Sequence, residues 1–161
     1  MDAKTYISVI GPSDASPEVL RIAEEVGAWV ARAGAILVTG GGGGAMEAAC
    51  RGAKGAGGTT LGLLPGSSRS EGNAFLDVAV PTGMGEMRNV LVVRAADGLV
   101  AVGGAFGTLS EIALALKLGK PIVGIGTWAA SIDGEAAPML IAKSAEQAVA
   151  LLMGDLPLPD D

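Results

Sequence analysis

The sequence predicts an α/β fold in which a parallel sheet is covered by helices on both faces. Short apolar runs alternate with segments of helical periodicity, and almost no polar residue interrupts the apolar runs. The 26 glycines cluster at the ends of those runs, as at strand-to-helix turns. With 161 residues, half of them hydrophobic, the chain can bury one substantial core. We therefore expect a doubly wound, Rossmann-like sheet in one domain spanning residues 1–161.

The first part of the chain is expected to hold three strands and two helices. The first strand ends at Gly11, and Ser16 is then placed to cap a helix whose first residue is Pro17. Gly34 ends that helix, and the unbroken run Gly40–Gly44 precedes the next one. The predicted strands are 6–10, 35–39 and 59–64, and the predicted helices are 17–33 and 45–56.

The second part continues the alternation. A short strand over 75–80 and a helix over 86–96 lead to the stretch 98–126, which reads as strand, glycine turn, helix and strand. No element is assigned to the Gly- and Ala-rich segment 127–143. Ser144 and Gln147 resemble a capping box for a final helix over 148–153, and the tail 155–161 is expected to fray.

Composition excludes several classes of function. The absence of His rules out a Ser-His-Asp triad, an imidazole metal ligand and a histidine base, and the lone Cys50 allows no intrachain disulfide and no zinc cluster. A net charge of −6 argues against a nucleic-acid partner. With no long apolar run and no signal-peptide pattern, the expected protein is cytoplasmic, without membrane attachment and without a metal site.

Two glycine loops predict binding of a phosphorylated small molecule. Each loop joins an apolar strand to a helix start, where free N–H groups and the positive helix end favour an anion. The spacing Gly40-x-Gly42-x-x-Ala45 resembles a dinucleotide motif, but it follows the second strand and lacks the later ribose-binding acid. An NAD-dependent oxidoreductase is therefore disfavoured. The expected ligand-binding residues are Gly11, Ser13, Gly40, Gly41, Gly42, Gly43, Gly44, Met46, Arg88, Asn89, Gly104, Ala105, Phe106, Gly107, Thr108 and Glu111.

Arg88 and Glu111 are the candidate catalytic residues. Glu111 lies about one turn into its helix, where the helix dipole is expected to keep the carboxylate ionised for ribose hydroxyls or for positive charge at a sugar carbon. Alternatively, the negative charge of Glu111 does no more than complement the helix dipole. Arg88 lies at the start of a mostly apolar helix, where a positive charge opposes the helix dipole. The side chain is therefore expected either to bind an anionic partner or to be exposed to solvent. Thr108 could cap its helix or donate to a phosphate, and both roles are compatible.

Three segments, TGGGGGAMEAA, GMGEMRN and GGAFGTLSEIALALKLGKP, resemble the LOG-type (Lonely Guy) superfamily. The likeness is greatest to the branch that contains molybdenum cofactor carrier proteins. LOG-type enzymes are phosphoribohydrolases of cytokinin nucleoside 5′-monophosphates, with a PGGxGTxxE signature and an upstream Arg-Lys pair. The signature residues kept here are Gly104, Gly107, Thr108 and Glu111. Gly103 replaces the Pro, Ala105 replaces the second Gly, and Asn89 replaces the Lys that follows Arg88.

The resemblance implies three readings. The first is a carrier that binds a phosphorylated cofactor, with the molybdenum cofactor as the candidate, and needs no cofactor of its own. The second is a phosphoribohydrolase in which Arg88 orients the nucleotide and Glu111 stabilises the oxocarbenium-like state. The third is an assembly protein, compatible with either function, because the resemblance implies a homo-oligomer, a dimer or a tetramer.

Overall fold

A seven-stranded parallel sheet forms the centre of the molecule. The computed structural model describes residues 3–155, so that most of the expected frayed tail lies outside the described residues. The strand order is β4-β3-β2-β1-β5-β6-β9, and every neighbouring pair is parallel. The strands are β1 (Tyr6–Ile10), β2 (Ile36–Thr39), β3 (Thr59–Leu64), β4 (Val78–Pro81), β5 (Gly98–Val102), β6 (Ile122–Ile125) and β9 (Leu140–Ile141). The predicted doubly wound α/β architecture is confirmed.

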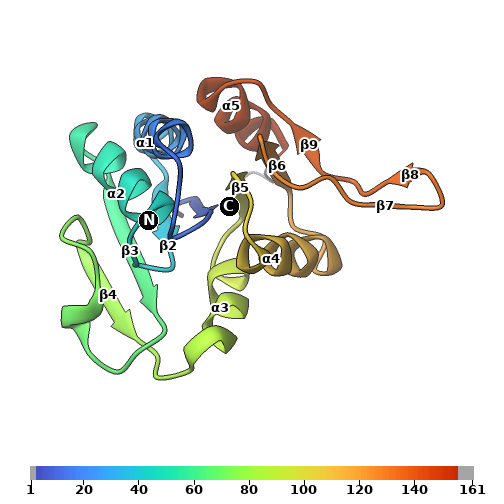
Figure 1. Cartoon of the computed structure of the whole chain (residues 1–161). Coiled ribbons are helices and arrows are strands. Elements are labelled where there is room, and N and C mark those ends of the chain that lie inside the picture. Colours follow the sequence, from blue (N-terminus) through green and yellow to red (C-terminus); the bar gives the residue numbers. More distant parts are fainter. Residues whose placement is uncertain (1–2, 156–161) are drawn as a thin grey trace.

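Helices cover both faces of this sheet (Figure 1). One face carries α1 (Pro17–Arg32), α2 (Ala45–Gly55) and α5 (Ala145–Asp155), and the other carries α3 (Asn89–Arg94) and α4 (Phe106–Lys117). The sequence of β5 is apolar throughout because helices cover both of its faces. Leu99 and Ala101 pack in the cluster of α3 and α4, whereas Val100 and Val102 pack in the cluster of α1 and α5. Both faces of the strand are buried, so no position tolerates a solvated side chain.

The predicted caps are confirmed at two helix ends. Ser16 Oγ accepts a hydrogen bond from Val19 N at 3.3 Å, with Pro17 as the first residue of α1. Ser144 Oγ accepts from Gln147 N at 3.2 Å, and the side chain of Gln147 accepts from Lys143 N at 2.8 Å. This box starts α5 at residue 145, three residues before the predicted start.

Three segments differ from the prediction. Strand β4 starts at Val78 because the residues before it form a turn, in which Asn73 Oδ1 accepts from Phe75 N at 3.0 Å. The helix predicted over 86–96 begins with a 3-10 turn, η2 (Gly85–Arg88), before α3; another, η1 (Arg69–Glu71), lies between β3 and β4. Segment 127–143, left without elements, contains β9 and a projecting hairpin.

The hairpin pairs β7 (Ser131–Ile132) with β8 (Glu135–Ala136) and extends away from the sheet (Figure 1). Asp133 and Gly134 both have positive φ angles, 52° and 84°, as in the tight Asp-Gly turns that favour hairpins. We call residues 130–138 the arm. No helix within residues 3–155 combines the length and apolar character needed to cross a membrane.

The strand order places a crevice beside β1 and β5. The chain leaves β1 toward β2 on one side and later resumes with β5 on the other, so the connections that follow these adjacent strands diverge. Doubly wound sheets bind ligands at the carboxyl ends of strands at such a switch point.

Two glycines let α1 and α2 approach closely. A Cβ on Gly27 would overlap the carbonyl oxygen of Ala49, and a Cβ on Gly52 would overlap that of Glu24. At each glycine, the backbone of the opposite helix therefore occupies the space that a side chain would fill.

We predict that Gly27→Ala lowers the free energy of unfolding by about 1–3 kcal/mol, since the added methyl must push the helices apart. Gly55→Ala, at the end of α2, is the control. No heavy atom lies within 4 Å of its Cβ position, and it should be neutral or stabilising by up to about 1 kcal/mol. Urea unfolding measures both, and equal stability of Gly27→Ala and the native protein would contradict this packing.

Candidate functional site

A cavity of about 200 Å³ lies at the switch point. Its lining comes from segments that follow the carboxyl ends of β1, β2, β4 and β5, so four strand–helix connections converge there. The lining residues are Gly11, Pro12, Ser13, Met46, Arg88, Asn89, Ala105, Gly107, Thr108 and Glu111. All but Pro12 belong to the predicted ligand-binding set.

Glycines allow the connections after β1 and β2 to touch. Gly44 has a φ of 62°, and its Cβ position is occupied by the carbonyl groups of Pro12 and Ser13. The N–H of Ala45, the first residue of α2, donates to the carbonyl of Pro12 at 3.0 Å. This bond consumes one of the free N–H groups of α2, so that end of the helix is partly satisfied by the protein itself.

Arg88 reaches the cavity because Gly40 has no side chain. A Cβ on Gly40 would overlap Nη1 of Arg88, so the guanidinium lies directly against the loop after β2. The Nε atom of Arg88 is buried and has no hydrogen-bond partner within the described residues. Burial lowers the pKa of Arg88 and the charge of Glu111 opposes that shift, but a guanidinium remains protonated at neutral pH.

The first turn of α4 forms another wall. The first backbone hydrogen bond of this helix runs from Leu109 N to Ala105 O at 3.0 Å, so the N–H groups of residues 106–108 have no acceptor inside the helix. The prediction that Thr108 caps the helix is wrong, because the capping residue is Ala105 and no side chain accepts there. Thr108 instead lines the cavity. Its hydroxyl is buried without a partner among residues 3–155.

The expectation that the helix dipole keeps Glu111 ionised is wrong. Glu111 lies in the second turn of α4 and is only 8% exposed. Burial raises the pKa of its carboxyl to about 7, and the positive charge of Arg88 only partly offsets this shift. Desolvation therefore leaves the carboxyl partly protonated at neutral pH. The two residues line the same cavity, but no ion pair joins them in the described part of the chain.

Several predicted binding residues do not line the cavity. In the loop 40–44, Gly41 N donates to Thr39 Oγ1 at 3.0 Å and Asn73 Nδ2 donates to Gly42 O at 3.0 Å. This loop therefore shapes and supports the cavity wall. Gly104 packs against Trp128, and Phe106 is 81% exposed at the outside of the same turn.

Pro12 also lines the cavity, although it is not in the predicted ligand-binding set. Its place in the Gly-Pro turn directly after the first strand, at the carboxyl edge of the sheet, is the feature of the sequence that could have indicated this.

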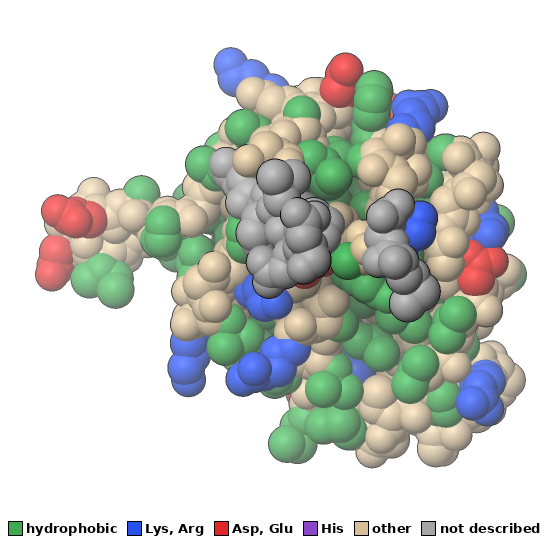
Figure 2. Space-filling model, turned by 180° about the vertical axis from the view of Figure 1, so that it is seen from behind, with side chains coloured by type: hydrophobic (Ala, Val, Ile, Leu, Met, Phe, Trp, Pro, Cys, Tyr) green, Lys and Arg blue, Asp and Glu red, His purple; other side chains and the backbone are tan. Residues whose placement is uncertain are grey.

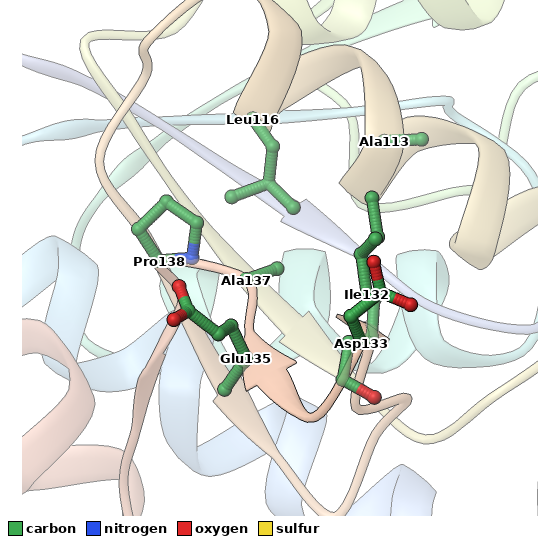
Figure 3. Close-up of a pocket in the computed structure, with 10 residues that line it drawn as sticks. Ala113, Leu116, Ile132, Asp133, Glu135, Ala137 and Pro138 are labelled. Carbon is green, nitrogen blue, oxygen red and sulfur yellow. The ribbon is translucent and has the colours of Figure 1, made fainter.

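A larger cavity of about 760 Å³ lies between α4 and the arm (Figure 3). Figure 3 shows Leu116 and Ala113 on α4 facing the apolar and acidic side chains of the arm. The charged residues in its lining, Asp133 and Glu135, are both acidic. Seen from behind, the arm projects well beyond the body and carries red acidic and green hydrophobic side chains (Figure 2). This acidic lining disfavours an anion, so the smaller cavity is the candidate site.

The raised pKa of Glu111 predicts a specific pH dependence of stability. Below about 4.5, the ordinary pKa of a Glu carboxyl, the group is protonated in both the folded and the unfolded chain. Between that pH and about 7 the unfolded chain loses the proton first, so rising pH favours unfolding, by about 3 kcal/mol in total.

Glu111→Gln should abolish this loss. In phosphate-free buffer, its free energy of unfolding relative to the native protein should rise between about pH 5 and pH 8. Glu25→Gln, on the exposed surface of α1, controls for removal of one carboxylate. If the free energies of unfolding of Glu111→Gln and the native protein changed in parallel with pH, the raised pKa of Glu111 would be contradicted.

The chain is similar to one family model and to several known proteins. Residues 4–154 match the model of the SLOG cluster4 family. An uncharacterized protein of Archaeoglobus fulgidus is 44% identical over 119 residues, which cover 74% of this chain and 78% of that protein. The molybdenum cofactor binding protein of Rippkaea orientalis is 35% identical, with a TM-score of 0.85 over 94% of this chain and 97% of that one.

The molybdenum cofactor carrier protein of Chlamydomonas reinhardtii is also 35% identical, with a TM-score of 0.81 over 94% of this chain and 98% of that one. These similarities extend over nearly the whole described structure. The chain therefore belongs to the SLOG cluster4 family, which confirms its resemblance to the carrier branch of the LOG-type superfamily.

Proposed function

We propose that this protein binds a phosphorylated cofactor of the molybdenum cofactor type and acts as its carrier. The phosphate enters the cavity between Arg88 and the first turn of α4. The observation that carries the proposal is a pair of buried donors without partners, Thr108 Oγ1 and Arg88 Nε, on two residues that line one cavity. The similarity to carrier and binding proteins of this cofactor supports the identity of the ligand.

An anion would satisfy both donors. A buried polar group that lacks a hydrogen bond costs about 1–3 kcal/mol, so a ligand oxygen that accepts from either donor gains a favourable contact there. Phosphate oxygens accept from a hydroxyl, from a guanidinium and from the free N–H groups that begin a helix. The chain carries a net charge of −6, so attraction for the anion must come from these local groups.

The cavity size fits the phosphate end of the ligand. Sites that enclose a whole small molecule usually measure about 300–1,000 Å³, and this cavity measures about 200 Å³. The phosphate therefore enters the cavity, and the ring system of a pterin lies across its rim. Asn89 and Ser13, which also line the cavity, add polar groups close to the entrance of the phosphate.

Binding without cleavage is the better account of the same residues. Stabilising an oxocarbenium-like state requires an ionised carboxylate, and burial leaves Glu111 about half neutral at pH 7. Asn89 stands where LOG-type hydrolases have Lys, and Ala105 where they have Gly. Each departure removes part of the hydrolase signature, while the partnerless donors that would hold a phosphate are kept.

Calorimetric titration with a pterin that carries a phosphate monoester tests the proposal. We expect saturable binding by the native protein, weakened about tenfold or more in Thr108→Val and Arg88→Ala. The first variant deletes one hydroxyl donor, and the second deletes the guanidinium with its N–H donors and its positive charge. Gly40→Ala should weaken binding as well, since the added methyl displaces the guanidinium of Arg88.

Arg32→Ala is the matched control for loss of a positive charge. Arg32 ends α1, at the edge of the sheet opposite the cavity, and its guanidinium lies 4.9 Å from the ring centre of Trp29. Its affinity should equal that of the native protein. The proposal fails if the native protein binds no phosphorylated pterin. Release of adenine from AMP, lost in Glu111→Ala, would instead establish the phosphoribohydrolase.

A further inference from the structure

An exposed aromatic residue lies in the chain between two residues that line the cavity. Phe106 is the first residue of α4 and is 81% exposed, although both of its neighbours in the chain, Ala105 and Gly107, line the cavity. Its ring lies 5.7 Å from the ring of Trp128, centre to centre, at an interplanar angle of 32°. The whole chain has only two Phe, two Trp and one Tyr. Two of these five aromatic residues therefore meet at the turn that begins α4.

The indole of Trp128 is fixed to the same turn. Its Nε1 donates to the carbonyl oxygen of Ala105 at 3.0 Å. The Cβ position of Gly104 lies 3.1 Å from that nitrogen, so the indole packs closely against the backbone and a side chain at residue 104 would crowd it. The pair therefore has a defined place relative to the N–H groups that begin α4. We call Phe106 and Trp128 the aromatic rim.

We propose that the aromatic rim binds the fused, planar heteroaromatic ring of the ligand whose phosphate enters the cavity. This inference rests on the proposed function, and it adds a ring-binding subsite to the phosphate subsite. A single molecule would occupy both, with its phosphate against Thr108 and its ring against Phe106.

Stacking explains why an aromatic side chain is left exposed at this place. An aromatic ring with a free face binds a planar heterocycle through dispersion and quadrupole contacts. Removal of one base–aromatic stacking contact weakens binding by about fivefold to a hundredfold. Such contact recognises a flat fused ring rather than its pattern of polar groups. Pterins and purines share that chemistry, whereas a sugar phosphate has the phosphate without the ring.

The experiment compares ligands that differ only in the ring system. Calorimetric affinities are measured for a pterin monophosphate, for AMP and for ribose 5-phosphate, with the native protein and with Phe106→Leu and Phe106→Tyr. Leu keeps an apolar side chain without a π face, and Tyr keeps the face. We expect the ratio of pterin monophosphate to ribose 5-phosphate affinity to fall about tenfold in Phe106→Leu and to be retained in Phe106→Tyr.

A second measurement reports on Trp128 directly. In a Trp29→Phe background Trp128 is the one remaining tryptophan of the chain, and its fluorescence should be quenched by pterin monophosphate but not by ribose 5-phosphate. The preference between pterin monophosphate and AMP then identifies the heterocycle.

The outcomes separate this inference from the proposed function. If no phosphorylated compound binds, the proposed function fails. If ribose 5-phosphate binds as tightly as the pterin, or Phe106→Leu leaves the ratio unchanged, only the aromatic rim is overturned. A change of oligomer mass in Phe106→Leu by light scattering, with an unchanged ratio, would make Phe106 a subunit contact instead.

Discussion

The placement of a half-buried arginine, Arg88, against a glycine loop is the constraint on which the site depends. Arg88 fits beside the connection after β2 only because Gly40 has no side chain, and it then shares a cavity with the buried carboxyl of Glu111. Burying both groups costs hydration, which appears as a lowered pKa for the arginine and a raised pKa for the glutamate. The fold thereby keeps the positive charge of Arg88 at the switch point of the sheet, which is the feature that the proposed anion site uses.

Under the proposed function, the same constraint favours holding a ligand over cleaving it. Thr108 and Arg88 both line the cavity from elements of regular structure, a helix turn and a short 3-10 turn, which hold their backbones in place. Fixed donors lose little entropy when an anion binds. Burial keeps the Glu111 carboxyl partly neutral, and Phe106 pairs with Trp128 at the turn that begins α4.

The sheet and most of its helices could be predicted from the sequence because their signals are local. Apolar runs, the Ser16 cap and the box at Ser144 depend on neighbouring residues and are found where expected. The arm and β9 were missed because strands of two residues are too short to show a period. The Asp133–Gly134 turn was the one local sign of the hairpin.

The site was only partly predictable, for physical reasons. A glycine without a side chain looks the same in sequence whether a ligand or a protein atom fills the space, so Gly40 and Gly44 were assigned to the ligand although Arg88 and two carbonyl groups occupy their Cβ positions. The ionisation of Glu111 depends on burial by distant segments, which helix position does not reveal. The pairing of Phe106 with Trp128 likewise depends on tertiary packing.

A crystal structure of the protein with a bound pterin monophosphate tests the central claim most directly. The account predicts phosphate oxygens within hydrogen-bond distance of Thr108 Oγ1 and of the Arg88 guanidinium, beside the N–H groups of the first turn of α4. A phosphate bound in the acidic cavity between α4 and the arm, or a ligand that leaves Thr108 and Arg88 without contacts, would contradict it.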